Sequence, residues 1–403
     1  MSTLKVDAIR HNSATSDAIT TASDGTCTAK LTSVAGGGLS HRNIIINGAM
    51  MVAQKGTTST SSGYHTVDRF KYTYSGTDNA PTQAQVNVDS GTTPYTLGFR
   101  NAYRITNANQ TSVGVSDRIR LEVNLEAQDI ANSGWNYKDP NSFITLSFWC
   151  KSSVAQNFYA NIRTPDGTSQ QYSFETGSLT ADTWTKVIKT IPGNANLTFD
   201  NNTELGWNMD ITMFMGTANT TPGNTMNQWY AYVSQNQMPD NTSTWYTTNG
   251  ATWEITGMQL EVGDTATTFE HRTKQEELER CSRYLQVFHV PTSDSYRASN
   301  ITATVHGTGS GVYLNVAFTH PMRAAPSVTV DGAFGGNVFT GSWSGATLSS
   351  ITAEYQTDAR CTLGFNGITS ASVTGSHTTG LTGQIYTANN GSADAALIYS
   401  AEL

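Results

Sequence analysis

The chain has 403 residues, which is long enough for two or three domains with a sizeable buried core. Charged residues make up only 13%, and 23 Lys and Arg against 31 Asp and Glu leave a net charge of −8. This balance argues against a nucleic-acid-binding protein, because such proteins carry a basic face. Aromatic residues reach 10%, too many for a disordered chain, so the composition favours an ordered β protein.

Residues 1–40 contain only short alternating apolar runs, LKVDAI and CTAKLTSV. We expect them to be either a disordered tail or strands completed by other copies of the chain. The glycines at 36–38 predict a flexible joint, and a new unit begins near His41. No segment has the pattern of a signal peptide or a membrane span, so we expect synthesis in a cytoplasm and no membrane insertion.

Residues 41–272 are predicted to form a two-layer β-sandwich of the jelly-roll kind. Apolar and polar residues alternate in this region, so that Ile144, Leu146 and Phe148 share one face of their strand. Gly, Asn, Pro and Asp turns separate the strands, and no helical period lies between them. The nine predicted strands are 43–52, 66–75, 99–106, 118–125, 142–153, 157–165, 184–192, 209–217 and 251–262.

Residues 273–290 are predicted to form a short linker helix, because Leu278, Cys281 and Leu285 recur at helical spacing. A short self-association contact is the alternative interpretation. Seven further strand-like runs between 291 and 403 predict a C-terminal β-sandwich. The complete expectation is therefore an all-β protein: an N-terminal oligomeric segment, a central jelly roll, a linker helix and a second β domain.

Two carboxylates that lie close together could catalyse the hydrolysis of a glycosidic bond, so the sequence was searched for such pairs. Glu122 and Glu126 are expected to be an outward, solvated pair. Glu254 and Glu261 are an odd number of positions apart, so an unbroken strand would aim them at opposite faces. Neither pair is a specific signal of a glycosidase active site. We therefore predict that the protein has no catalytic residues and is not an enzyme.

Metal and cofactor sites are not predicted. The four cysteines lie far apart, and the eight histidines are scattered singly, with no metal-ligand spacing. A structural calcium ion held by Asp68, Asp89 or Glu261 stays open, because loop carboxylates are suitable oxygen donors.

Aromatic residues accumulate among amides and hydroxyls in several predicted loops. The CH face of a pyranose stacks on an aromatic ring, while Asn, Gln, Asp and Thr take the sugar hydroxyls. This chemistry predicts carbohydrate recognition without bond cleavage; the alternative is that the rings anchor their loops to the core. The candidate carbohydrate-binding residues are Trp135, Tyr137, Trp229, Tyr230, Trp245, Tyr246, Tyr296 and Trp343.

Five blocks of the sequence resemble tail fibre proteins of marine and cyanobacterial bacteriophages. They are MSTLKVDAI, HRNIIINGAMMVAQKGT followed by GYHTVDRF, ITLSFWCKSS, WEITGMQLEVGDTATTFEHRTKQEELERCSRYLQV and FTHPMRAAPSVTV. The central blocks resemble a carbohydrate-binding jelly roll. The resemblance implies a homotrimeric virion fibre, released by host lysis, whose N-terminus docks to other tail proteins and whose C-terminal domain is a receptor-binding tip.

The resemblance also implies roles for individual residues. Leu4, Val6 and Ile9 fall in the tail-attachment segment, and Asp68 and Arg69 are expected to pair within the sandwich. The other matched positions are fold-defining: Asn47, Gly48, Trp253, Gln259, Glu261 and His271. The leading hypothesis is therefore a non-enzymatic fibre that binds host surface polysaccharide or lipopolysaccharide. A polysaccharide-depolymerising tailspike and a purely structural virion component are the alternatives.

Overall fold

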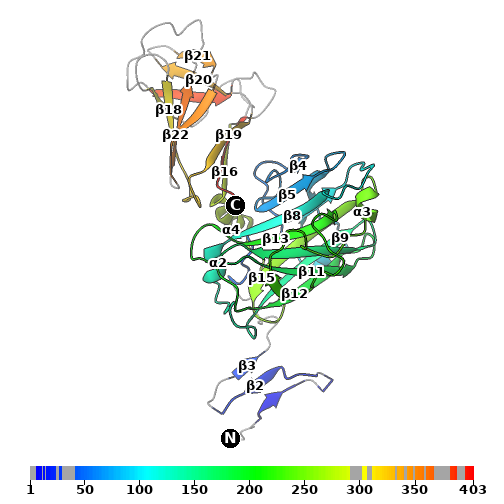
Figure 1. The fold of residues 1–403 in the computed structure, drawn as a ribbon. Coiled ribbons are helices and arrows are strands. Elements are labelled where there is room, and N and C mark those ends of the chain that lie inside the picture. The colour runs from blue at the N-terminus through cyan, green and yellow to red at the C-terminus, as the bar shows by residue number, and fades with distance from the viewer. Residues whose placement is uncertain are drawn as a thin grey trace.

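The computed structural model describes residues 6–10, 12–13, 15–23, 27–29, 41–290, 302–305, 311–331, 334–339, 343–347, 350–357, 360–366, 382–387 and 395–403. In these residues nearly all regular elements are strands, which confirms the predicted all-β class (Figure 1). The chain runs from a small N-terminal sheet through a large sandwich to a C-terminal β unit.

The N-terminal sheet has three short antiparallel strands, β1 (Ala8–Ile9), β2 (Ile19–Thr21) and β3 (Cys27–Ala29). Val6 and Ile9 are 42% and 54% exposed, and several large apolar side chains of the sandwich are similarly exposed. Leu4 lies outside the described residues. Completion of this sheet by other copies of the chain stays a prediction.

The sandwich consists of two six-stranded antiparallel sheets, which confirms the predicted jelly roll. Sheet I has the order β14-β11-β10-β13-β8-β5, and sheet II has the order β12-β9-β15-β7-β6-β4. The strands of sheet I are β5 (Phe70–Ser75), β8 (Arg118–Glu126), β10 (Asn157–Thr164), β11 (Gln170–Ser178), β13 (Leu205–Met215) and β14 (Trp229–Ala231). Those of sheet II are β4 (Thr58–Ser59), β6 (Thr82–Asn87), β7 (Asn101–Thr106), β9 (Phe143–Ser152), β12 (Thr185–Pro192) and β15 (Thr252–Val262). The connections contain α1 (Thr93–Thr96), α2 (Ala127–Ala131) and α3 (Thr244–Thr247).

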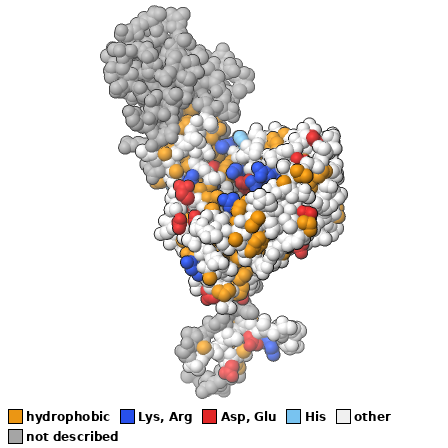
Figure 2. Space-filling model, viewed as in Figure 1, with side chains coloured by type: hydrophobic (Ala, Val, Ile, Leu, Met, Phe, Trp, Pro, Cys, Tyr) orange, Lys and Arg blue, Asp and Glu red, His pale blue; other side chains and the backbone are white. Residues whose placement is uncertain are grey.

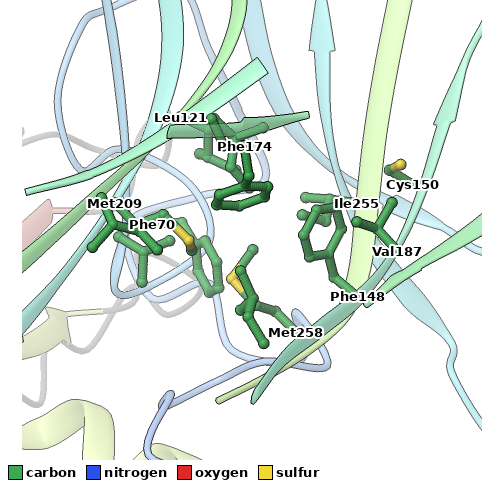
Figure 3. Packing of buried hydrophobic residues seen from close by; sticks show 14 of the residues in the cluster. Phe70, Leu121, Phe148, Cys150, Phe174, Val187, Met209, Ile255 and Met258 are labelled. Carbon is green, nitrogen blue, oxygen red and sulfur yellow. The ribbon is translucent and has the colours of Figure 1, made fainter. Parts of the chain in front are cut away.

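The hydrophobic core lies between the two sheets (Figure 3). Phe70, Leu121, Phe174 and Met209 come from sheet I, whereas Phe148, Cys150, Val187, Ile255 and Met258 come from sheet II. Each strand contributes its apolar positions to this layer because neighbouring side chains on a strand point to opposite faces. The polar positions of the same strands therefore line the two outer faces.

Eight of the nine predicted sandwich strands are present, and the segment 43–52 is the exception. Its side chains Ile45, Met50 and Val52 are buried as expected, but its backbone forms turns. The side chain of Asn47 binds both the N–H and the carbonyl of Val52, at 3.0 and 2.9 Å. An amide side chain thus takes hydrogen bonds that a neighbouring strand would otherwise supply.

Helix α4 (Lys274–Ser282) begins at Thr273, whose side chain forms a reciprocal capping box with Glu276. It is shorter than the predicted helix, because residues 285–290 form the strand β16 (Leu285–Val290). β16 pairs along its length with β25 (Ala395–Ser400), and these sheet hydrogen bonds override the local helical pattern. None of the helices in the described part of the chain is long and apolar enough to cross a membrane.

The C-terminal unit contains a three-stranded sheet, β16-β25-β19, and a seven-stranded sheet, β21-β20-β24-β17-β18-β23-β22. The remaining bounds are β17 (Thr302–Val305), β18 (Gly311–Ala317), β19 (Ser327–Asp331), β20 (Phe334–Phe339), β21 (Trp343–Thr347), β22 (Ser350–Gln356), β23 (Arg360–Asn366) and β24 (Thr382–Thr387). This unit contacts the sandwich through Arg323, which donates to the carbonyl of Thr203 at 2.9 Å.

The expected pairing of Asp68 with Arg69 is wrong. The carboxylate of Asp68 accepts hydrogen bonds from the backbone and side chain of Gln54, at 2.9 and 2.6 Å. Arg69 instead forms a buried ion pair with Glu402 and donates to the carbonyl of Asn124. Both residues lie in a turn, where Arg69 has φ +72°, and the two side chains find separate partners elsewhere in the chain.

Candidate functional site

Four of the aromatic residues predicted to be exposed for sugar stacking are buried, and the prediction is wrong for them. Trp245 and Tyr246 have no exposed surface, and Trp135 and Trp229 are 3% and 9% exposed. All four belong to the core cluster of the sandwich. They cannot offer a ring face to a ligand in this fold.

The polar atoms of these rings explain how the loops can bury them. Trp135, Trp229 and Trp245 donate their indole N–H groups to the carbonyls of Ser142, Pro192 and Thr252, at 3.2, 2.7 and 3.1 Å. The Tyr246 hydroxyl donates to Asp117 at 2.8 Å, and its ring stacks on Phe214. Buried Trp and Tyr side chains normally find such partners. These residues therefore anchor their loops to the core, as in the alternative interpretation.

The other four candidate carbohydrate-binding side chains are either half-buried or outside the described part of the structure. Tyr137 is half-buried and packs edge-on against Phe199. Tyr230 is half-buried, and its hydroxyl donates to the carbonyl of Asn236 and accepts from the Asn224 amide. Tyr296 and the side chain of Trp343 lie outside the described residues.

The first carboxylate pair is buried, so the expectation of solvation is wrong. Glu122 and Glu126 both lie on the outer face of β8, but they are only 5% and 0% exposed. Glu126 accepts two hydrogen bonds from Arg283, at 2.7 and 2.8 Å, and one from Tyr284. Four positions on a strand span roughly 13 Å, which exceeds the spacing of about 5–10 Å that glycosidases use.

The second pair lies on one face of sheet II, not on opposite faces. A bulge interrupts the pairing of β15 with β9 between Thr256 and Gln259, and it contains Gly257 at φ +64°. One extra residue reverses the alternation, so Glu254 and Glu261 face the same way. Their partners on β9 are Lys151 and Thr145, roughly 20 Å apart at about 3.3 Å per residue. This separation excludes a shared glycosidic bond.

The suggested calcium donors do not meet in one place. Glu261 accepts hydrogen bonds from Thr267 and forms an ion pair with Arg42, whereas Asp68 is occupied by Gln54. In the described part of the chain, no group of three or more His, Cys, Asp or Glu side chains is placed to hold a metal ion. Asp89 is 75% exposed at its side chain and lies near Lys151.

A polar groove lies on the outer face of sheet I. It has a volume of about 340 Å³ and crosses β5, β8, β13 and β10. The apolar residues of these strands face the core, so charged and amide side chains fill the alternate positions. The lining residues are Lys71, Arg118, Arg120, Glu122, Asn124, Asn161, Arg163, Leu205, Asn208, Asp210, Tyr232, Gln237 and Leu403. Figure 2 shows basic side chains gathered over the region where Figure 1 labels β8 and β13.

An ion-pair network forms the floor of the groove. Arg120 donates to Asp210 at 2.6 Å and contacts Glu122 at 3.0 Å, and Lys71 lies 3.2 Å from Glu122. Burial opposes the ionisation of Glu122, but the charge of Arg120, a hydrogen bond from Thr73 and the charge of Lys71 outweigh it and lower its pKa. Burial raises the pKa of Asp210 to about 6 against the charge of Arg120, and the negative charge of Glu122 adds to the increase.

A loop that follows β14 forms one wall of the groove. The carbonyl of Gln237 accepts hydrogen bonds from Asn161 and Ser173 on the sheet, at 2.8 and 2.6 Å. Tyr232 on the same loop is half-buried, and the guanidinium of Arg163 lies 4.6 Å from its ring centroid. An aromatic ring and a cation are thus held together beside the polar floor.

Residues of the C-terminal segment close one end of the groove. The carbonyl of Leu403 accepts hydrogen bonds from Tyr64 and Asn124, at 2.9 and 3.1 Å. The buried pair of Arg69 and Glu402 lies next to this contact in sequence. The C-terminal segment therefore helps to shape the groove.

A second cavity, of about 600 Å³, lies where the chain enters the sandwich from the N-terminal segment. It is lined by residues 41–44 and 46, by side chains around α2, and by Val262 and Arg280. Burial raises the pKa of Asp129 in this cavity to about 6, and the charge of Glu126 adds to the increase. Its position adjoins the predicted attachment segment, whereas the groove lies on a sheet face.

The sequence contained a signal for the groove that the aromatic-loop hypothesis did not use. In RIRLEVNL, Arg118, Arg120, Glu122 and Asn124 alternate with apolar residues, which places four polar groups on one face. The order of strands in the sheet is not readable from the sequence, so the meeting of β8, β13 and β10 could not be predicted.

Comparisons with known proteins give only distant structural similarities. No protein-family model matches the chain, and no curated protein matches its sequence. The enzymatically active domain of tailspike protein 4 from bacteriophage CBA120 is 12% identical with a TM-score of 0.30, and the match covers 55% of this chain and 21% of that one. The N-terminal cellulose-binding domain of Cellulomonas fimi β-1,4-glucanase C is 10% identical with a TM-score of 0.25, over 53% of this chain and 98% of that one.

A third similar structure is the CBM22-1–CBM22-2 tandem domain of Paenibacillus barcinonensis Xyn10C. It is 9% identical with a TM-score of 0.26, and the match covers 89% of this chain and 96% of the tandem domain. The chain spans about a fifth of the length of the tailspike domain. At these identities the function has to be argued from the geometry of the groove itself.

Proposed function

We propose that this protein is a bacteriophage tail fibre that binds a host surface glycan, polysaccharide or lipopolysaccharide, in the polar groove of sheet I and without catalysis. The observation that carries this proposal is the groove itself: an open cavity of about 340 Å³ whose floor consists of charged and amide side chains on a rigid sheet. Sugar hydroxyls are recognised by such convergent donors and acceptors. The groove replaces the aromatic loops as the candidate site.

The side chains of the groove have the chemistry that a sugar needs. Asn161, Asn208 and Gln237 offer amide groups, and Tyr232 offers a half-buried ring at the wall. Hydrogen bonds within the protein already fix these groups, so binding costs them little conformational entropy. A preorganised site of this kind suits recognition of a flexible polysaccharide.

The virion location is proposed from the ends of the described chain. The exposed apolar side chains Val6 and Ile9 on the N-terminal sheet are available for contact with other tail proteins or with two further copies of the chain. A homotrimer would present three grooves to one cell surface, and multivalent binding can raise apparent affinity by about 100-fold or more. The C-terminal β unit would form a second contact at the tip.

A depolymerising tailspike is the second candidate, favoured by one observation. Glu122 and Asp210 are direct partners on neighbouring strands, and their environments shift their pKa values in opposite directions. Such a split is typical of acid and base pairs in glycosidases. We favour binding because Arg120 contacts both carboxylates, which engages the groups that catalysis would need to be free.

Adsorption to host cells tests the proposal. Tyr232→Ala should reduce binding of the full-length protein to host cells and reduce its ability to block phage adsorption. Tyr95→Ala is the matched control, because Tyr95 is also half-buried and lies under an arginine, Arg100, at 4.0 Å, away from the groove. Equal binding by both variants and the native protein would contradict the proposed site.

Chain-length analysis of host polysaccharide separates the two candidate functions. Incubation with the native protein should leave the polymer length unchanged. Shortened chains that disappear with Asp210→Asn would show that the groove is a hydrolase site.

A further inference from the structure

We infer that the groove selects a polyanionic glycan, one whose sugars repeatedly carry a carboxylate or a sulfate, and that Arg163 and Arg118 bind these negative groups. The inference rests on the proposed function and adds the charge of the ligand to it. Its basis is two arginines of the groove that form no ion pair with a carboxylate among the described residues.

The groove contains more positive than negative charge, in a protein whose net charge is −8. Its four side-chain cations are Lys71, Arg118, Arg120 and Arg163, and its two side-chain carboxylates are Glu122 and Asp210. Lys71 and Arg120 are engaged by these carboxylates. Within the described residues, no carboxylate forms an ion pair with Arg118 or Arg163. Two guanidinium groups are therefore left for a ligand.

The side chain of Arg163 is held in place by stacking, but one of its hydrogen-bond donors has no partner in the described structure. Its guanidinium stacks on Tyr232 at 4.6 Å, which restricts its orientation. Its Nε atom is buried and has no hydrogen-bond partner in the described structure. The side chain as a whole is half-buried, so its accessible part, and not the buried Nε atom, would contact a ligand. The planar guanidinium matches the paired oxygens of a carboxylate or a sulfate.

Arg118 lies toward the other end of the same groove. Arg163 on β10 pairs with Asn208 on β13, and Asn208 pairs in turn with Asn124 on β8. Arg118 lies at the opposite end of β8, where it pairs with Met215. Along the strands these positions are roughly 20 Å apart at about 3.3 Å per residue. The backbones of the two arginines are therefore far apart along the groove. A chain that repeats its negative charge can engage both arginines, and this spacing is why we infer a polyanion.

Calorimetric titration of the full chain tests this inference with three probes of matched length. They are an oligogalacturonate, a sulfated galactan oligosaccharide and a neutral galacto-oligosaccharide. At least one acidic probe should bind about tenfold or more tighter than the neutral probe, since a charge-assisted hydrogen bond is roughly twice as strong as a neutral one. Comparison of the two acidic probes identifies the carboxylate or the sulfate as the preferred group.

Variants of the two arginines locate the effect. Arg163→Gln and Arg118→Gln should each weaken binding of the preferred acidic probe by about tenfold and weaken binding of the neutral probe much less. Arg163→Lys should recover part of the loss, because it keeps the charge but not the planar fork. Arg100→Gln is the matched control, since Arg100 also stacks on a tyrosine but lies outside the groove.

The outcomes separate this inference from the proposed function. Equal binding of the neutral and acidic probes, unaffected by Arg163→Gln, would overturn the inference and leave glycan binding intact. Equal losses with Arg163→Gln and Arg100→Gln would also overturn it, because they would indicate unspecific charge attraction. Failure of all three probes and of host polysaccharide to bind would instead overturn the proposed function.

Discussion

Replacement of Trp245 by alanine should unfold the sandwich at a much lower temperature, because this side chain is a core element. Trp245 has no exposed surface, and its indole N–H donates to the carbonyl of Thr252 at 3.1 Å. Removing a buried tryptophan costs about 3–5 kcal/mol, mainly through lost packing, because the Thr252 carbonyl keeps its hydrogen bond from the Ser153 N–H. For a domain of about 230 residues this corresponds to a fall in Tm of roughly 6–20 °C.

Differential scanning calorimetry of the full chain measures this effect, with Tyr232→Ala as the comparison. Tyr232 is half-buried at the wall of the groove, so its loss should lower the Tm only slightly while weakening glycan binding. The reasoning would be refuted if Trp245→Ala melted within about 2 °C of the native protein and lost glycan binding. That result would mean that the ring contacts the ligand and not the core.

Three further predictions concern the bulge, the groove and the attachment segment. Gly257→Ala should destabilise the sandwich in a chemical denaturation experiment, because position 257 has φ +64° and an added Cβ would lie 2.6 Å from the Phe99 ring; an unchanged midpoint would contradict the role of the bulge. Affinity for an oligogalacturonate should rise between about pH 7 and about pH 5, since Asp210, with a pKa of about 6, loses its negative charge as the pH falls. Glu122 stays ionised because its pKa is lowered, and Asp210→Asn should abolish the pH effect in titrations; a pH effect that persists in this variant would have another source. Deletion of residues 1–40 should release the protein from purified virions in an immunoblot, and retention on the virion would contradict the attachment proposal.

The sandwich could be predicted because alternation of apolar and polar residues is a local property of each strand. Ile119, Leu121 and Val123 alternate with charged residues on β8, and all three are buried as this pattern requires. The strand predicted for residues 43–52 is not formed, because the side chain of Asn47 makes the hydrogen bonds that a neighbouring strand would make. A hydrophobic pattern predicts which side chains are buried, but it does not predict which groups form hydrogen bonds with the backbone.

The site was harder to predict, for two physical reasons. An aromatic residue in a polar loop can face solvent or anchor the loop, and its sequence context is the same in both cases; Trp229 and Trp245 are anchors. The groove depends on which strands are neighbours, and the pairing of Glu122 with Asp210 joins residues that are far apart in sequence. The single bulge at Gly257 also reversed the face expected for Glu261.

Hydrogen–deuterium exchange of the full chain, with and without a bound acidic oligosaccharide, tests the central claim most directly. We predict protection of peptides from β8, β10 and β13 and from the loop that contains Tyr232 and Gln237, because these elements line the groove. Protection confined to sheet II or to the loop of Trp135 would contradict the assignment of the groove as the glycan site.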